Sequence, residues 1–240
     1  MEVVVLPTAD AAVAYAHGLI VEHLKAKPST VLGLPTGATP LGVYVRLVES
    51  YRSGAVSWRS VTTFNLDEYW GLGEYHLTSY AAYMRRVLFD HVDCPLRQRH
   101  IPNGCATDAV AEARGYEASI DQAGGIDMLL LGLGRNAHIG FNEPGSPFTS
   151  RTRLVDLAPL TLAANKLHFA SGEEPPGQAI SMGIATILQS RRIVVLATGA
   201  AKAEAVRRSI REEPNVEVPG SALQFAQDVT FVVDEAAAGA

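Results

Sequence analysis

The stretch DMLLLGLGRNAHIGFNEPGS, residues 127–146, joins a nearly continuous apolar run to a glycine-rich polar loop. The run, residues 127–133, lacks the alternation of polar and apolar side chains that marks a half-exposed strand. Strands that are buried on both faces of a parallel sheet have this pattern. We therefore predict a parallel strand at 127–133 with a polar loop at its carboxyl end.

Short apolar runs of the same kind recur along the chain, at residues 2–6, 30–34, 61–66, 192–198 and 229–233. Helical patterns lie between them, at residues 11–27, 40–54, 79–92, 109–124, 178–190 and 200–213. We expect Asp10 to cap the first helix, and Pro40 to begin the second in its first turn. This β-α-β order predicts an α/β fold: an open, mostly parallel sheet of about six or seven strands with helices on both faces.

The chain has 240 residues, a length that fits one domain spanning 1–240. Some forty residues between Asn136 and Gly177 contain no clear strand pattern. Long irregular insertions in compact α/β domains are usually functional, so we predict a lid at about 145–177.

The composition excludes several classes of protein. Hydrophobic residues make up 48% of the chain and charged residues 19%, which is not the composition of a disordered protein. A net charge of −5 argues against nucleic-acid and anionic-membrane binding, and no apolar run is long enough to span a membrane. Cys94 and Cys105 form no disulfide or metal pattern, so we expect reduced, buried thiols in a cytoplasmic protein.

Two carboxylates, Asp67 and Glu68, come directly after the apolar run 61–66. Ligands of open α/β sheets bind beyond the carboxyl ends of the strands. Adjacent carboxylates in that place can supply a general base, particularly if burial raises the pKa of one of them. The alternative is a helix cap with a solvated neighbour.

Three polar residues, Asn136, His138 and Glu143, lie among glycines after the run 127–133. A histidine titrates near neutral pH and can move protons, and a nearby carboxylate can orient it and hold its charged form. A lone histidine is usually structural, but this setting predicts a catalytic one. We expect no metal, because one histidine without HxH or HExxH spacing is too few ligands.

Two further segments could hold an anion. Thr36, Gly37, Ala38 and Thr39 form a turn that runs into a helix, where backbone N–H groups and the helix dipole favour negative charge. Lys202, one of four lysines, opens a helix in a position that opposes the dipole, which a bound anion would explain. The alternatives are an ordinary turn with a threonine cap and a solvated surface lysine.

Taken together, these segments resemble the glucosamine-6-phosphate deaminase family, within the wider sugar-phosphate isomerase superfamily. The matching pieces run in family order: LGLPTGATP, VTTFNLDEYWGL, SYAAYM, FDHVDCP, LLGLGRNAHIGFNEPGS, SRTR, QAISMGIATIL and AKAEAV. DEY combined with HIGFNEP is highly specific, and the related 6-phosphogluconolactonases lack FNEP. The resemblance implies a Rossmann-like fold of the sugar-phosphate isomerase type.

The resemblance also implies a reaction, the isomerisation and deamination of glucosamine 6-phosphate to fructose 6-phosphate and ammonia in amino sugar catabolism. Asp67 matches the base that moves the C2 proton to C1. His138 matches the group that opens the pyranose ring, and Asn136 and Glu143 match the residues that orient it.

Further implications concern ligands and partners. Residues Thr36 to Thr39 match the phosphate loop of the family, and Lys202 matches a phosphate lysine. The reaction needs no metal or organic cofactor. The expected partner is a small-molecule amino sugar phosphate, without nucleic acid or membrane, and the protein is either a monomer or a homo-oligomer.

One departure from the family pattern bears on the substrate. Relatives have an arginine that grips the phosphate where this chain has Leu167 in ANKLHF, residues 164–169. Loss of a bidentate clamp predicts weaker phosphate binding, with Lys166, His168, Arg151 or Arg153 as candidate replacements. The alternative function is a 6-phosphogluconolactonase-like or isomerase activity on another sugar phosphate. A third is a non-catalytic sugar-phosphate sensor.

Regulation is a further point on which the chain departs from hexameric relatives. Ser146 and Arg153 fit the allosteric site of those relatives, but Val155 replaces a lysine. We therefore expect no activation by N-acetylglucosamine 6-phosphate.

Overall fold

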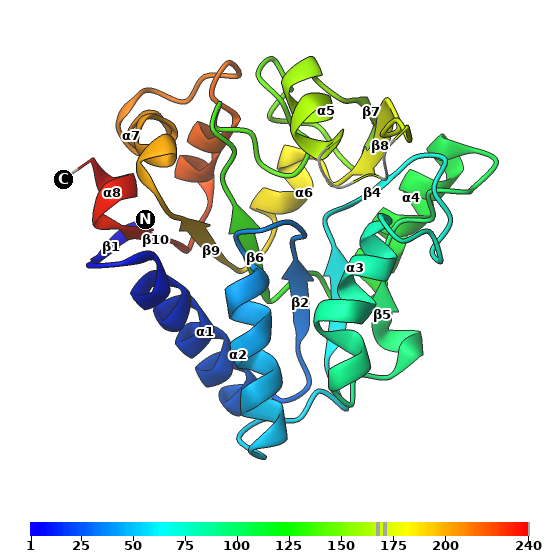
Figure 1. Cartoon of the computed structure of the whole chain (residues 1–240), viewed down its shortest axis with the longest axis horizontal. Coiled ribbons are helices and arrows are strands. Elements are labelled where there is room, and N and C mark those ends of the chain that lie inside the picture. The colour runs from blue at the N-terminus through cyan, green and yellow to red at the C-terminus, as the bar shows by residue number, and fades with distance from the viewer. Residues whose placement is uncertain (167–168, 170–171, 240) are drawn as a thin grey trace.

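The computed structural model describes residues 1–166, 169 and 172–239. Its main sheet has seven strands in the order β1-β10-β9-β6-β2-β3-β5, and every neighbouring pair is parallel. The strands are β1 (Glu2–Leu6), β2 (Val31–Leu34), β3 (Thr62–Asn65), β5 (Arg99–His100), β6 (Met128–Gly132), β9 (Arg192–Ala197) and β10 (Val229–Asp234). The predicted α/β class and the six predicted strands are confirmed (Figure 1).

Helices cover both faces of this sheet (Figure 1). One face packs against α1 (Ala9–Ala26), α2 (Leu41–Arg52) and α3 (Tyr80–Val87). The other packs against α4 (Ala109–Gln122), α6 (Ile184–Leu188), α7 (Ala203–Arg211), the 3-10 helix η4 (Pro219–Phe225) and α8 (Glu235–Ala238). Three shorter 3-10 helices are η1 (Phe89–His91), η2 (Leu96–Gln98) and η3 (Ala200–Lys202). In the part of the chain that is described, no helix is long and apolar enough to cross a bilayer.

Strand β9 illustrates why the apolar runs are continuous. Val194 and Leu196 face the core beneath α1 and α2, and Ile193 and Val195 face the core beneath α4, α6 and α7. Successive side chains of a strand point to opposite faces, so a sheet that is covered on both sides needs apolar residues at every position.

A second, smaller sheet was not predicted. It contains β4 (Asp67–Tyr69), β8 (Gln178–Ser181) and β7 (Arg153–Asp156), in the order β4-β8-β7 with antiparallel pairs. The predicted helix 178–190 is therefore wrong in its first half, because 178–181 is a strand and only α6 is helical. This sheet and α5 (Pro159–Lys166) lie beyond the carboxyl ends of the main strands (Figure 1).

Three local predictions also need correction. Thr8, not Asp10, caps α1: its side chain accepts the N–H of Ala11 at 3.1 Å. The predicted helix 79–92 divides into α3 and the 3-10 turn η1. Cys94 is buried as expected, but Cys105 is exposed.

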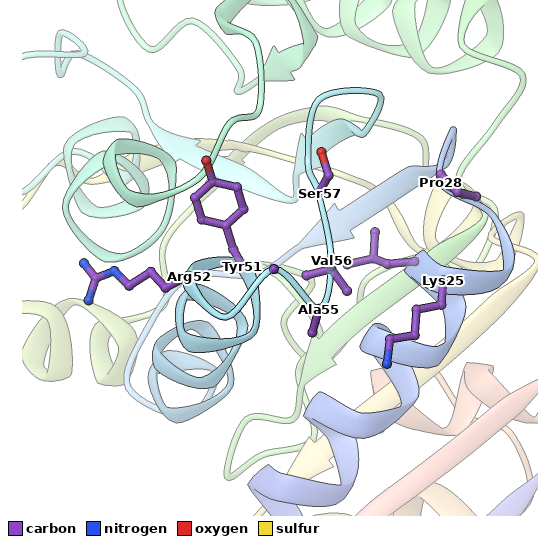
Figure 2. A pocket seen from close by; sticks show the side chains of 9 residues that line it. Lys25, Pro28, Tyr51, Arg52, Ala55, Val56 and Ser57 are labelled. Atoms are coloured by element: carbon purple, nitrogen blue, oxygen red, sulfur yellow. The ribbon is translucent and has the colours of Figure 1, made fainter.

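A cavity of about 570 Å³ lies at the amino ends of β2 and β3. Lys25 from the end of α1 and Arg52 from the end of α2 lie on opposite sides of it (Figure 2). The predicted site residues follow the carboxyl ends of their strands, so this cavity lies at the other edge of the sheet from them.

Candidate active site

The predicted site residues follow four strands that are neighbours in the main sheet. Lys202 follows β9, the 133–143 loop follows β6, the 36–39 turn follows β2, and Asp67 follows β3. Because all four strands are parallel, these segments emerge at one edge of the sheet.

Asp67 begins the second sheet immediately after β3, opposite Ser181 of β8. Its side chain is buried, and within the described residues no hydrogen bond reaches its carboxylate. Burial, and then the charge of neighbouring Glu68, raise the pKa of Asp67 to about 8. This carboxylate is thus a strong proton acceptor that titrates close to neutral pH.

The side chain of Glu68 points to the opposite face of the same strand, where it binds the N-terminus of α3. Its carboxylate accepts the backbone N–H groups of Tyr69, Tyr80 and Ala81, each at 2.9 Å. Burial raises the pKa of Glu68 to about 7, although these three hydrogen bonds act in the other direction. Of the two carboxylates, Glu68 accepts hydrogen bonds from a helix N-terminus, whereas Asp67 has no donor in the part of the chain that is described. Neither is solvated.

The 133–143 loop passes directly over Asp67. A Cβ atom at Gly140 would lie 3.7 Å from Asp67 Oδ2 and 3.2 Å from Ser181 Oγ. Gly140 also has a φ of 55°, which L side chains rarely adopt. The chain therefore brings the segment that carries His138 next to the segment that carries Asp67.

Within this loop, Glu143 contacts both of the other predicted site residues, Asn136 and His138. Asn136 Nδ2 donates to Glu143 Oε2 at 2.7 Å. His138 Nδ1 is buried and lies 3.4 Å from Glu143 Oε1, an ion-pair distance without the alignment of a hydrogen bond. The side chain of His138 is 29% exposed, so part of the ring remains accessible.

Glu143 has a further partner that sequence reasoning missed. Thr161 of α5 donates its hydroxyl to Glu143 Oε1 at 2.6 Å. Burial would raise the pKa of Glu143, but the interaction with His138 and the hydrogen bonds from Thr161 and Asn136 outweigh burial and lower the pKa to about 2. Glu143 is therefore charged at neutral pH. Thr161 lies 18 residues after Glu143, and nothing in its local pattern marks it as a site residue.

The backbone between Asn136 and His138 is held in an uncommon conformation. Ala137 has a φ of 64°, and among the described residues it is the only non-glycine residue with a positive φ. Its carbonyl accepts the N–H of Gly220 in η4 at 2.8 Å. A Cβ atom at Gly134 would lie 2.4 Å from the His138 ring, so only glycine fits there. Such strain is maintained only where surrounding structure enforces it, and it clusters at functional sites.

The 36–39 turn and the proline before it are held by tyrosines of α3 and α2. Tyr83 of α3 donates to the carbonyl of Gly37 at 2.6 Å, and Tyr44 of α2 donates to that of Pro35 at 2.5 Å. Gly37 and Ala38 are exposed, and the turn leads through Pro40 into α2. Its backbone is thus accessible at a helix N-terminus, as an anion site requires.

Lys202 is half-buried in η3, so it is not a solvated surface lysine. Its Nζ donates to the carbonyl of Leu133, where the 133–143 loop begins, at 2.6 Å. Burial, and then the charge of Arg135, lower the pKa of Lys202. The ammonium therefore lies at the same edge of the sheet as the loop that holds His138.

The position of the missing arginine, Leu167, lies outside the described residues, as does His168. The other three candidate replacements have partners elsewhere in the chain. Lys166 pairs with Glu174, Arg151 pairs with Glu117, and Arg153 donates to Asn142 Oδ1 at 2.8 Å.

Comparison with known proteins places this arrangement in a family. The sequence model described as glucosamine-6-phosphate isomerases/6-phosphogluconolactonase matches residues 7–232. The chain belongs to this family. The resemblance read from the motifs is thereby confirmed.

Individual members are similar over nearly their whole length. Glucosamine-6-phosphate deaminase of Rhodopirellula baltica is 52% identical over 99% of this chain and 95% of its own. The enzyme of the same name from a Geobacillus species is 50% identical, with 92% and 88% covered.

Solved structures of the family have the same fold. A monomeric glucosamine-6-phosphate deaminase superposes with a TM-score of 0.96 at 43% identity, covering 100% of this chain and 99% of its own. The 6-phosphogluconolactonase of Trypanosoma brucei superposes with a TM-score of 0.76 at 21% identity, covering 99% and 97%, so it shares the fold.

Proposed function

We propose that this protein is a glucosamine-6-phosphate deaminase, which converts glucosamine 6-phosphate and water to fructose 6-phosphate and ammonia. The observation that carries the proposal is a contrast between two carboxylates. Asp67 is buried and has no donor among the described residues, whereas Glu143, beside His138, accepts hydrogen bonds from Asn136 and Thr161. A proton transfer between adjacent carbons needs a base of the first kind, and ring opening needs a histidine held by the second.

His138 opens the ring in this proposal. The imidazole passes a proton between the anomeric hydroxyl and the ring oxygen, so it has to bind and release one in each turnover. Its Nδ1 is turned toward Glu143, which leaves Nε2 for the substrate. Glu143 stays charged because its pKa is about 2, and Asn136 fixes its second oxygen.

Asp67 performs the isomerisation. Its carboxylate takes the proton from C2, which gives an enolamine, and returns a proton to C1, which leaves an imine at C2. Water then adds to C2 and ammonia departs, so the ketone forms without any change of overall oxidation state. The raised pKa of Asp67 matches it to proton transfer near neutral pH.

The phosphate binds in this proposal at the turn Thr36, Gly37, Ala38 and Thr39, with Lys202 supplying positive charge. The exposed backbone of the turn lies at the N-terminus of α2, where the helix dipole favours an anion. The segment 145–177 acts as the lid, because its strand β7 and helix α5 lie over the strand ends where the substrate would sit. That covering favours the charge interactions of the site by excluding water.

The alternative activity is that of a 6-phosphogluconolactonase, and the family description includes it. The 6-phosphogluconolactonases of Trypanosoma brucei and Trypanosoma cruzi are 21% and 20% identical to this chain, and the similarity extends to the fold alone. A lactone hydrolase needs no base that shuttles a proton between carbons, so the donor-free setting of Asp67 favours the deaminase.

One assay separates these functions. Purified protein is incubated with glucosamine 6-phosphate, and ammonia and fructose 6-phosphate are measured together; equal amounts of both are expected. The same preparation is assayed for hydrolysis of 6-phosphogluconolactone. Lactone hydrolysis without ammonia release would overturn the proposal.

A further inference from the structure

We propose that Thr161 is a positioning residue for ring opening, one that fixes the Glu143 carboxylate only when helix α5 is packed in place. This inference rests on the proposed function and deepens it. It gives one residue of the 145–177 segment a defined role at the catalytic loop.

Each oxygen of the Glu143 carboxylate accepts a hydrogen bond from a different side chain. Oε2 accepts from Asn136 Nδ2 at 2.7 Å, which fixes one edge of the carboxylate from within the loop. Oε1 accepts from Thr161 Oγ1 at 2.6 Å, and the same oxygen lies 3.4 Å from His138 Nδ1. The threonine hydroxyl therefore determines where the oxygen that faces the imidazole lies.

Removing the Thr161 hydroxyl would leave the Glu143 carboxylate free to rotate about its terminal torsion. The terminal torsion of a glutamate is broad and roughly two-fold, so one donor alone does not define its plane. Among the described residues, Asn136 would then be the only side chain left with a hydrogen bond to Glu143, and the His138 imidazole would lie beside it at an ion-pair distance. The direction of the negative charge toward His138 would vary, while the loop backbone stays held by Gly220.

The helix that carries Thr161, α5, packs against the segments that carry Asp67 and His138. Thr161 lies near the start of α5, and the next residue, Leu162, packs against an apolar cluster of Tyr69, Phe141, Leu157, Phe169 and Ala179. Tyr69 belongs to the strand that begins at Asp67, and Phe141 belongs to the loop that carries His138. The position of α5 is thus set by packing against both halves of the site. Through its hydrogen bond, Thr161 makes the position of the Glu143 carboxylate depend on the position of α5.

The test compares Thr161→Val, which keeps the β-branched shape without the hydroxyl, with Thr161→Ser, which keeps the hydroxyl. For Thr161→Val we expect kcat with glucosamine 6-phosphate to fall roughly ten-fold, the effect of losing one hydrogen bond to a charged group. Thr161→Ser should recover most of it. Thermal midpoints of both variants should stay close to that of the wild type.

A second readout separates positioning from binding. The open-chain alcohol made by reducing C1 of glucosamine 6-phosphate binds without ring opening, so its inhibition constant should stay within two-fold of the wild-type value. Thr186→Val is the matched control, because it removes a threonine–glutamate hydrogen bond, to Glu117 at 2.5 Å, that lies outside the site. Its kcat should not change.

Several results would overturn the inference. These are an unchanged kcat in Thr161→Val, equal losses in Thr161→Val and Thr161→Ser, a parallel weakening of the open-chain inhibitor, or an equal loss in Thr186→Val. Each of them requires an active wild type. A wild type that releases no ammonia overturns the proposed function itself, and the inference with it.

Discussion

The corner between β3 and β4 and the loop after β6 each bring one carboxylate to the same edge of the sheet, but they surround it differently. At the corner, Asp67 is buried with no donor among the described residues, and its pKa is raised. In the loop, Glu143 is half-buried with donors from Asn136 and Thr161 and the imidazole of His138 beside it, and its pKa is lowered.

This difference teaches how one fold assigns two tasks to two chemically similar groups. Burial acts on both carboxylates in the same direction, toward the neutral form. Hydrogen-bond donors reverse the outcome at Glu143, and among the described residues none reaches the carboxylate of Asp67. Environments that push pairs of titratable groups apart are how acid and base roles are divided at neutral pH. The comparison therefore predicts different consequences for the same carboxylate-to-amide change at the two positions.

Asp67→Asn should give the largest effect. The amide has the same shape but cannot accept the C2 proton, so ammonia release should fall by about 10²–10⁴-fold. The measurement is ammonia release together with exchange of the C2 proton in deuterated water, and inhibition by the open-chain alcohol checks that binding persists. Substantial C2 exchange in this variant would mean that another residue is the base.

Glu143→Gln should give a smaller loss, about ten- to a hundred-fold in kcat, because the amide keeps the position but loses the charge that faces His138. The substrate KM should change much less, since the effect falls on ring opening. The measurement is steady-state kinetics on glucosamine 6-phosphate. A loss as large as that of Asp67→Asn would show that the two carboxylates do not differ in role as proposed.

The substitution Asp67→Asn should also stabilise the folded protein at alkaline pH. The folded pKa of about 8 lies above the ordinary value, so folding takes up a proton, and the stability that this contributes is lost as pH rises from about 4 through 8. At pH 8.5, Asp67→Asn should be more stable than the wild type by about 2–5 kcal/mol. Urea unfolding of both proteins at pH 5 and pH 8.5 measures this. An equal gain at both pH values would point to a cause other than titration.

Glu68→Gln should give the smallest effect of the four and should sharpen the contrast with its neighbour. The amide cannot accept all three backbone N–H groups, so α3 should lose about 1–2 kcal/mol of stability. Activity should stay within a few-fold of the wild type at a temperature where the variant is folded. A loss of C2 exchange comparable to that of Asp67→Asn would assign the base to Glu68 instead.

The main sheet could be predicted from the sequence because its signal is local. Each of the six predicted strands is an apolar run, and burial on both faces makes such runs continuous. The second sheet gave no such signal. Its strands read DEY, RLVD and QAIS, and their pairing joins segments far apart in the chain. QAIS also leads into a helical pattern, and for that reason the sequence predicts a single helix over 178–190.

The site could be predicted only in part for a similar reason. Four site residues are recognisable in the sequence because they carry reactive or hydrogen-bonding side chains directly after apolar strands: Asp67, Asn136, His138 and Glu143. The division of labour between Asp67 and Glu68 depends on where α3 begins, and Thr161 depends on where α5 packs. Both are tertiary contacts that local spacing does not encode. The consequence of Leu167 stays a prediction.

The hydrogen bond from Gly220 to Ala137 has a consequence for protein engineering. The motif from Gly134 to Glu143 reads as a self-contained cassette, but its backbone shape is clamped by η4, which comes about eighty residues later in the chain. A Cβ atom at Gly220 would lie 2.4 Å from Ser209 Oγ and 3.2 Å from the Ala137 carbonyl oxygen, so this position admits little substitution. A loop transplanted into another scaffold would keep its amino-acid sequence but not its backbone conformation, unless the counterpart of η4 were grafted with it.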